Sequence, residues 1–421
     1  MQFLTRSVTF TLLLCGSVLE LFGQADSRLA EIAAQQEQKA NDAKPEQPGK
    51  IERGFIAVRE HDWLQRISAG ADGFGPKFGG LAPGTGFGVG AQFRRTDLLN
   101  GQLTFRTSAV VSVRGSRKFD LELAAPKLSG GRYFADFYAV HHNYPTLSYY
   151  GPGPDSRKTG RTDFRLEDTA FDGAFGVRPV KHLMIAGVAG YVFNNIGPGT
   201  DSRFASTETV YSPQQATGIN AQSNFLRVGG YAQYDRRDNP DGTRSGGNYI
   251  AQFSDYRDQT FGLSNFRRVD LEAQQFVPVL NQRRVFAVRA KSTLTYADGG
   301  LPIPFYMQPS LGGSDDLRGY RAYRFRGNNM MVMNAEYRWE VFSGLDMAVF
   351  GDAGQVFNHR SDFEPSRLQS DLGFGFRFNQ RNKTFLRLDV GFSHEGFQVW
   401  VKFNNLFSKG PVRTSSSMGD F

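Results

Sequence analysis

The chain has 421 residues and a formal net charge of +8, and its 38 Phe, 16 Tyr and 48 Gly accompany only 21% charged residues. Aromatic residues favour strands and glycines favour tight turns, so the composition argues against a helical bundle rich in Ala, Leu and Glu. The positive charge is a modest excess, typical of a solvated surface, and we expect no nucleic-acid partner.

Residues 1–25 have the layout of a secretory signal peptide. Arg6 precedes an apolar stretch, and the small-x-small pattern that ends at Ala25 predicts cleavage there. Cys15 follows a leucine rather than a small residue, so lipidation is the weaker alternative. Because Cys15 is the only cysteine, its removal excludes disulfides, cysteine metal sites and cysteine catalysis from the mature chain.

The next segment, residues 26–62, is rich in Ala, Gln, Glu and Lys and contains Pro45 and Pro48. We expect a polar periplasmic linker with room for one short helix. Beyond the signal there is no run of 18 apolar residues, so no membrane helix is predicted. Export without such a helix leaves a periplasmic protein, a secreted protein or a membrane β-barrel.

From Trp63 the chain alternates with a period of two. In residues 102–113 one face carries Leu103, Phe105, Thr107, Ala109, Val111 and Val113. A soluble β-sandwich also alternates. Many of the segments, however, exceed the usual five or six residues of soluble strands and suit a tilted crossing of an apolar band about 25 Å tall.

The polar face of these segments carries full charges, which favours a wet lumen inside and lipid outside. The inward-facing charged residues are Arg106, Asp120, Glu122, Arg227, Asp270, Glu272, Arg289, Lys291, Glu336, Arg338, Asp371, Arg377, Arg387 and Lys402. The prediction is therefore an all-β chain: a transmembrane antiparallel β-barrel over residues 63–407, followed by a polar tail over residues 408–421.

The alternation divides into sixteen segments, an even number as bacterial single-chain barrels have. They are 63–75, 84–95, 102–113, 117–126, 131–142, 166–179, 182–194, 223–236, 245–257, 266–278, 283–297, 329–340, 345–357, 368–379, 383–393 and 396–407. The longest connections follow odd-numbered segments, and most of those after even-numbered segments are short. Long loops on one side and short turns on the other are typical of such barrels.

The sequence contains few residue combinations that could form a catalytic site. His141 and His142 are adjacent in one segment, so they face opposite sides and cannot chelate one ion. Asp315-Asp316 suggests an acidic pair, and Ser148 or Ser156 with His142 suggests a lipase-like pair, but neither has a recognisable orienting partner. We expect no enzyme activity, no catalytic residue, no metal site and no cofactor.

The stretch "LGGSDDLRGYRAYRFRG" interrupts the alternation. With Arg318-Gly319-Tyr320 it resembles the loop signature of the outer-membrane protein assembly superfamily, the BamA- and TamA-like or bacterial surface antigen barrels. The resemblance covers roughly residues 63–407 and extends to four further stretches: 234–247, 335–339, 349–357 and 371–378. It implies a sixteen-stranded barrel with a long extracellular loop folded into the lumen.

The resemblance also implies how that loop is anchored. The family's arginine packs against acidic residues on the next two strands, and the matching positions here are Glu336 and Asp352. An arginine fork between two carboxylates would pin the loop, Gly319 would permit tight backbone, and Tyr320 would pack against the wall. The alternative is an exposed basic loop.

Two features depart from this family. Its assembly factors carry periplasmic substrate-capture domains before the barrel, and residues 26–62 are too few for one; a polar tail follows Phe407. The predicted function is insertion or translocation of proteins at the bacterial outer membrane. The expected partners are outer-membrane lipid, a client protein and a periplasmic accessory protein. The alternatives are a passive pore or structural barrel, and a dedicated exporter of one partner protein.

Overall fold

The computed structural model describes residues 34–35, 73–280, 282–300, 302–380, 383–407 and 410–418. The chain divides into two units, residues 1–54 and residues 55–421, and the fold below is that of the second. The predicted signal peptide, the predicted linker and the first ten residues of the segment predicted at 63–75 lie outside the described residues.

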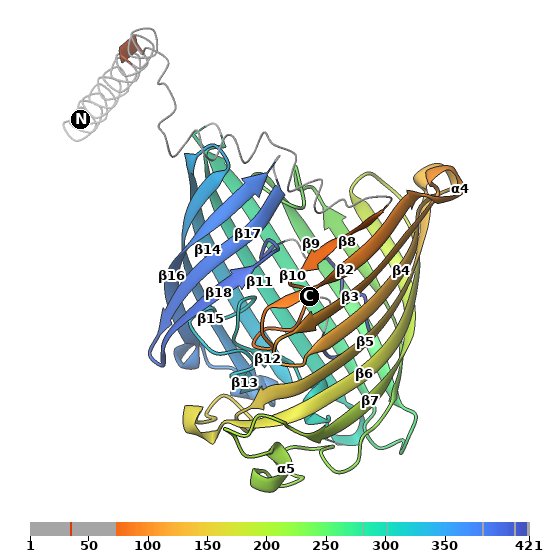
Figure 1. Cartoon of the computed structure of the whole chain (residues 1–421), viewed down its shortest axis with the longest axis vertical. Coiled ribbons are helices and arrows are strands. Elements are labelled where there is room, and N and C mark those ends of the chain that lie inside the picture. Colours follow the sequence, from red (N-terminus) through yellow and green to blue (C-terminus); the bar gives the residue numbers. More distant parts are fainter. Residues whose placement is uncertain are drawn as a thin grey trace, which may run out of the picture. The chain divides into compact units, whose positions relative to one another are not determined.

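The second unit is a sixteen-stranded antiparallel sheet in which each strand pairs with its neighbours along the chain (Figure 1). Its strands are β1 (Phe74–Phe78), β2 (Gly88–Asp97), β3 (Leu103–Ser112), β4 (Arg117–Leu128), β5 (Tyr133–Tyr149), β6 (Thr162–Val177), β7 (Leu183–Pro198), β8 (Phe225–Asp235), β9 (Gly246–Asp258), β10 (Phe266–Val279), β11 (Arg284–Ala297), β14 (Asn329–Phe342), β15 (Leu345–Phe357), β16 (Gln369–Gln380), β17 (Lys383–Ser393) and β18 (Gly396–Lys402). A separate two-stranded sheet pairs β12 (Ser310–Leu311) with β13 (Phe325–Arg326).

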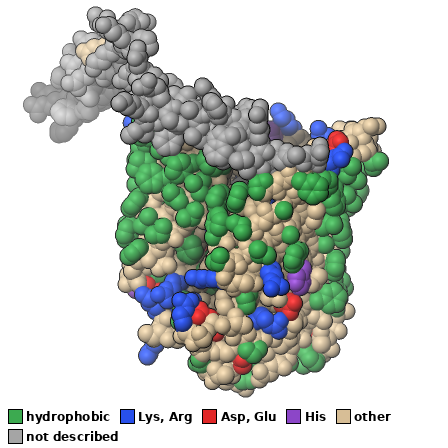
Figure 2. All heavy atoms as spheres, in the orientation of Figure 1, with side chains coloured by type: hydrophobic (Ala, Val, Ile, Leu, Met, Phe, Trp, Pro, Cys, Tyr) green, Lys and Arg blue, Asp and Glu red, His purple; other side chains and the backbone are tan. Residues whose placement is uncertain are grey.

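The sheet curls around an interior, which we call the lumen, and the two faces of its strands differ as the alternation predicts. Outward residues such as Phe175 and Val399 remain 60% and 58% exposed, although they are large and apolar. Inward residues such as Arg227 and Arg387 are fully buried. Figure 2 shows hydrophobic side chains spread over the visible strand surface, as expected of a surface that faces lipid.

Helical structure in the described part of the second unit is confined to single turns in the connections. These are the α-helical turns α4 (Leu98–Gly101) and α5 (Thr207–Val210) and the 3-10 turns η1 (Ser129–Gly131), η2 (Lys158–Gly160), η3 (Asp298–Gly300), η4 (Phe305–Met307), η5 (Arg360–Asp362) and η6 (Pro365–Arg367). None of the helices in the described part is long and apolar enough to cross a membrane.

The prediction of sixteen strands is confirmed, and three segments need the largest corrections to their boundaries. The fifth strand continues to Tyr149 rather than ending at residue 142. The first strand begins at Phe74 and ends at Phe78, so it overlaps the predicted segment by only two residues. The last strand ends at Lys402 rather than at residue 407. The reason is that Leu406 and Phe407 turn inward, where they pack against Phe276 of β10.

The connections give the sheet two unlike ends, which we call the long-loop end and the short-turn end. The long-loop end carries α5 and the connections 150–161, 199–224 and 298–328, and it lies at the bottom of Figure 1. Its interior is filled by a buried aromatic cluster that includes Tyr149, Phe164, Phe225 and Phe305. The loop between β11 and β14 belongs to this end and also enters the lumen.

Candidate functional site

The loop between β11 and β14 re-enters the lumen as a hairpin. The short strands β12 and β13 pair at its neck, so the residues between them form its tip. Gly312 has a positive φ of 110°, and a side chain there would lie 2.3 Å from the carbonyl oxygen of Arg321. Only glycine allows the chain to turn so tightly at that point.

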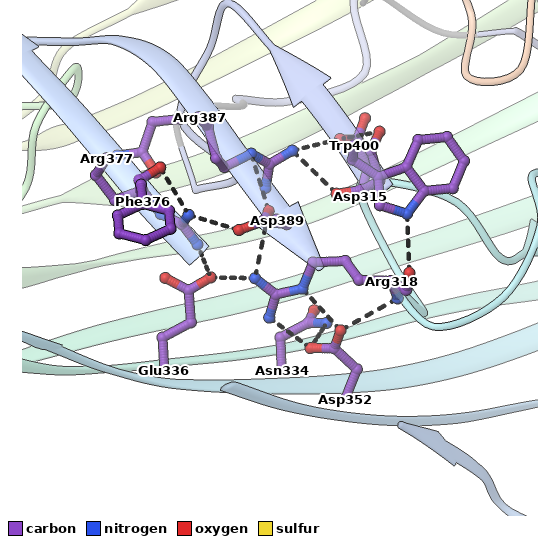
Figure 3. Close-up of polar contacts among 12 residues, drawn as sticks. Asp315, Arg318, Asn334, Glu336, Asp352, Phe376, Arg377, Arg387, Asp389 and Trp400 are labelled. Carbon is purple, nitrogen blue, oxygen red and sulfur yellow. Dashed lines mark hydrogen bonds and ion pairs between the residues drawn. The ribbon is translucent and has the colours of Figure 1, made fainter. Parts of the chain in front are cut away.

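Arg318 lies at the tip and is completely buried. Its Nε and Nη2 atoms each donate to a different oxygen of Asp352, both at 2.7 Å, and its Nη1 donates to Glu336 (Figure 3). The guanidinium carbon lies 3.5 Å from the ring centre of Phe350. The arginine is therefore held by a bidentate ion pair, a second carboxylate and an aromatic face.

The strand register explains why these two carboxylates meet one arginine. Asn334 is directly opposite Asp352 in the β14–β15 ladder, and Glu336 is opposite Phe350. Glu336 and Asp352 are therefore diagonal neighbours on the inner face. Asn334, which was not among the predicted site residues, donates 2.8 Å to Asp352 and 2.7 Å to the carbonyl of Asp316.

The ion pairs continue beyond the predicted residues. Arg377 of β16 donates to both Glu336 and Asp389, and Arg338 donates to Glu336 at 2.7 Å. Arg387 of β17 lies 3.4 Å from Asp389 and donates to the loop carbonyl of Ser314 at 2.9 Å. These side chains, with Arg318 and Asp352, form one buried network, which we call the lumen network. Its arginine and carboxylate members are Arg318, Arg338, Arg377, Arg387, Glu336, Asp352 and Asp389.

Gly319 brings loop backbone directly against β16 and β17. A side chain at Gly319 would lie 2.5 Å from the Cβ of Asp371 and 2.9 Å from the backbone of Phe392. Opposite it, a side chain at Gly391 would lie 2.5 Å from the carbonyl carbon of Arg318. Two glycines therefore face each other, and both are needed for this close approach.

Neighbouring polar groups bind the backbone of the tip. Ser393 donates to the carbonyl of Gly319 at 2.9 Å, and Trp400 donates to the carbonyl of Arg318 at 2.8 Å. Ser393 ends β17, and Trp400 belongs to β18. The tip therefore contacts the last strand of the sheet as well as β14 to β17.

Tyr320 packs in a small buried cluster with Leu311, Leu317 and Phe325. Its hydroxyl donates to the carbonyl of Ser370 at 3.2 Å. Burial, together with nearby carboxylates, raises the pKa of Tyr320 to about 12. The hydroxyl therefore keeps its proton at neutral pH and remains a donor.

The structure brings together all five residues of the predicted anchor: Arg318, Gly319, Tyr320, Glu336 and Asp352. The alternative of an exposed basic loop does not fit the structure, because Arg324 and Arg326 are buried as well as Arg318. That the contacts serve to anchor the loop stays a prediction. Arg377 was predicted to face the lumen, but neither Arg377 nor Asp389 was among the predicted anchor residues. The alternation of β16 and β17 places both on the polar face, and it was the available signal for their part in the network.

The residues considered for catalysis lie apart. Ser156 accepts a hydrogen bond from Arg324 at 2.9 Å, and Ser148 accepts one from Arg161 at 3.2 Å. His142 instead pairs with Asp168 at 2.7 Å on the inner wall. Among the described residues, no group of three or more His, Cys, Asp or Glu side chains is arranged to hold a metal ion.

Residues 116–395, more than half of the chain, match the family model of the Omp85 superfamily domain. The chain belongs to the Omp85 superfamily. The matched residues include the hairpin loop and all four strands that hold the lumen network, β14 to β17.

Two solved Omp85-like structures share the fold. BamA from Haemophilus ducreyi lacking POTRA domains 1–3 aligns with a TM-score of 0.58 and 15% identity over 78% of this chain and 70% of that chain. CdiB from Escherichia coli aligns with a TM-score of 0.54 and 13% identity over 77% of this chain and 61% of that chain. No curated protein matches the sequence.

Proposed function

We propose that this Omp85 chain is an outer-membrane barrel that aids insertion or translocation of proteins through a seam between β1 and β18. The observation that carries the proposal is the order of the sheet. Pairing among the described residues runs from β1 to β18 with no ladder that joins these two strands to each other. They are also the shortest strands of the sheet, with 5 and 7 residues.

The contacts across this seam are side-chain contacts. Phe403, which follows β18, lies 6.0 Å from Phe78 of β1 and 5.6 Å from Phe87, measured between ring centres. A ladder would add a series of backbone hydrogen bonds, each contributing about 0.5–1.5 kcal/mol net. Because β1 and β18 meet only through aromatic side chains, separating them should cost less free energy than separating two strands that share a ladder.

An open seam would expose the unpaired backbone groups of β1 and β18. Such edges bind extended segments by adding a strand to the sheet. A client strand that emerges from the lumen, or one that arrives from the periplasm, could pair there before it enters the lipid. A periplasmic accessory protein would deliver the client.

The hairpin loop would keep this opening local. Its tip contacts β14 to β18. The contact with β18, one of the two seam strands, is the hydrogen bond from Trp400 to the carbonyl of Arg318. The lumen network ties β14, β15, β16 and β17 to one loop, so that wall moves as a unit. In this proposal the weak seam lies beside a wall that the loop holds rigid.

A passive pore is the second candidate function, and the observation that favours it is a polar cavity in the lumen. A cavity of about 800 Å³ remains between the loop and the walls of β4 to β11, and polar residues such as Glu122, Asp270 and Lys291 line it. Ions would pass through such a cavity if it were continuous from end to end. Planar-bilayer recordings separate the candidates, because the pore predicts a steady current from the wild-type protein.

Depletion in the native host, followed by an outer-membrane proteome, tests the proposed function. Broad loss of other β-barrel proteins supports insertion, and loss of one surface or secreted protein supports a dedicated exporter. An unchanged proteome with altered uptake of small solutes would contradict the proposal and support a pore.

A further inference from the structure

Part of the chain after β18 lies inside the lumen. Residues 410–418, which we call the tail segment, contact inward-facing side chains of β4, β5, β6, β8 and β9. Thr414 and Ser415 are completely buried, and Met418 belongs to the large aromatic cluster at the long-loop end. The polar composition of this segment is that of a solvent-exposed tail, yet the fold buries much of it.

The wall binds the backbone of the tail segment. The side-chain amide of Gln252 contacts Val412 twice: it donates to the carbonyl at 3.0 Å and accepts from the N–H at 2.9 Å. Arg227 donates to the same carbonyl at 2.9 Å, and Asp172 accepts from the N–H of Ser415 at 2.8 Å. Backbone contacts do not depend on the identity of the side chain, so the same wall suits other extended segments.

The wall also contacts three side chains of the tail segment. Arg413 donates to Glu122 at 2.6 Å, and the hydroxyl of Ser415 donates to Asp172 at 3.1 Å. Ser416 donates to Asp168, which is already paired with His142. Carboxylates at these positions select one basic residue and, two and three positions later, hydroxyl residues.

The wall residues that contact the tail segment are mostly buried, as in a formed binding site, rather than exposed to solvent. Asp168, Asp172, Arg227 and Gln252 are between 0% and 4% exposed. Buried carboxylates and amides carry a desolvation cost unless they are hydrogen-bonded, and the tail segment supplies part of that bonding. The tail segment also lines the 800 Å³ cavity, together with loop residues such as Tyr323 and Arg326.

We propose that the inner wall of β4 to β9 is a binding site for an extended polypeptide that carries a basic residue followed by hydroxyl residues. The tail segment occupies this site in cis and acts as a plug. Another segment reaches the wall only when the tail segment leaves it. The proposal does not rest on the seam between β1 and β18.

A fluorescent peptide with the sequence GPVRTSSSM, residues 410–418, tests this in the full-length protein by fluorescence anisotropy. A tethered segment competes at an effective concentration of about millimolar, so the wild-type wall is closed to micromolar peptide. The double variant Ser415→Asp, Ser416→Asp places carboxylates beside Asp172 and Asp168 and releases the tail segment. It is expected to bind the peptide at least about tenfold more tightly than the wild type. The conservative control is Ser415→Thr, Ser416→Thr, which keeps both hydroxyls and is expected to behave like the wild type.

A third variant shows where the peptide binds. Adding Gln252→Ala to the released double variant removes both contacts to the backbone of Val412 and is expected to reverse the gain in affinity. Equal peptide binding by the wild type and the released variant overturns the proposal. So does a gain in affinity that Gln252→Ala leaves unchanged, because the peptide would then bind elsewhere.

A charge reversal at Arg413 provides a second test if the released double variant does not fold. Arg413→Glu places a carboxylate beside Glu122 at a position where 47% of the side chain is exposed, so it weakens binding of the tail segment and keeps every wall residue. It is expected to bind the peptide more tightly than the wild type, whereas Arg413→Lys is expected to behave like the wild type. Equal binding by Arg413→Glu and the wild type overturns the proposal.

Discussion

Asp352 binds Arg318 through both of its carboxylate oxygens, with Nε and Nη2 each 2.7 Å away. Both side chains are buried completely, and the same aspartate also accepts from the backbone N–H of Arg318 at 3.2 Å. The pair therefore joins the tip of the lumen loop to the inner face of β15 through three hydrogen bonds.

Reversing either charge of this pair is expected to release the loop. Arg318→Glu places a carboxylate beside Glu336, Asp352 and Asp389, and Asp352→Arg removes the bidentate partner. Loss of one partner of a buried pair costs about 3–5 kcal/mol in the free energy of unfolding. Thermal unfolding monitors the loss, and planar-bilayer conductance, which should rise, monitors release of the loop.

The double reversal is expected to restore only part of the lost stability. It re-forms the pair, but the new glutamate still faces Glu336, and the new arginine loses Asn334 as a donor partner. Full additivity of the two single effects would contradict direct coupling between positions 318 and 352.

Gly319→Ala is expected to displace the tip without changing any charge. The added methyl group would lie 2.5 Å from the Cβ of Asp371, a distance that non-bonded carbons do not adopt. Gly173→Ala on β6 is the matched control, because the nearest atom to its added methyl is 3.9 Å away. Limited proteolysis should cut the loop of the first variant and spare that of the second.

Trp400→Phe tests the contact between the loop and the last strand. It keeps an aromatic ring but removes the hydrogen bond to the carbonyl of Arg318, so stability should fall by about 0.5–1.5 kcal/mol. Phe397→Leu is the control, since Phe397 is on β18 with 62% of its surface exposed and lies outside the loop contacts. Equal effects of the two substitutions on thermal unfolding would show that the indole hydrogen bond contributes little.

Alkaline pH should loosen the loop through Tyr320. Its pKa is raised in the folded protein to about 12, whereas an exposed tyrosine titrates near 10. A raised folded pKa means that this stabilisation is complete below about pH 10 and is lost as the pH rises through about 12. Proteolytic protection of the loop should fall over this window in the wild type, and Tyr320→Phe should lack that component.

The sequence predicted the sheet well because period-two alternation is a local signal that tertiary contacts reinforce. It predicted Glu336 and Asp352 because both face the lumen and match the family's loop signature. Gly319 was predicted for tight backbone, but its partners Asp371 and Phe392 follow from the approach of distant backbones, which no local pattern encodes. Trp400 was missed for the same reason.

The tail segment shows the limit of composition as a guide. Its Pro, Ser and Thr residues are typical of solvent-exposed chain, and only the fold reveals that Gln252, Arg227 and Asp172 surround it. The boundary at Lys402 was missed because Phe403 continues the alternation of β18. The chain then turns into the lumen, where Phe407 meets Phe276.

A disulfide across the seam between β1 and β18 tests the central claim most directly. A Cβ at Gly79 would lie 3.7 Å from the Cβ of Phe403, a separation that suits a disulfide, so the locked protein carries Gly79→Cys and Phe403→Cys. Gly79 has a positive φ of 72°, and the strain that this places on a cysteine is the same with and without reductant, so it does not affect the comparison. The control carries Val89→Cys and Val111→Cys, which pair across the β2–β3 ladder, where no opening is proposed.

Each protein replaces the native chain in the host, and the measurement is the abundance of the other outer-membrane proteins with and without reductant. The account predicts that the locked protein fails to sustain them until reductant is added, whereas the control sustains them throughout. A locked protein that works as well as its reduced form would contradict the account.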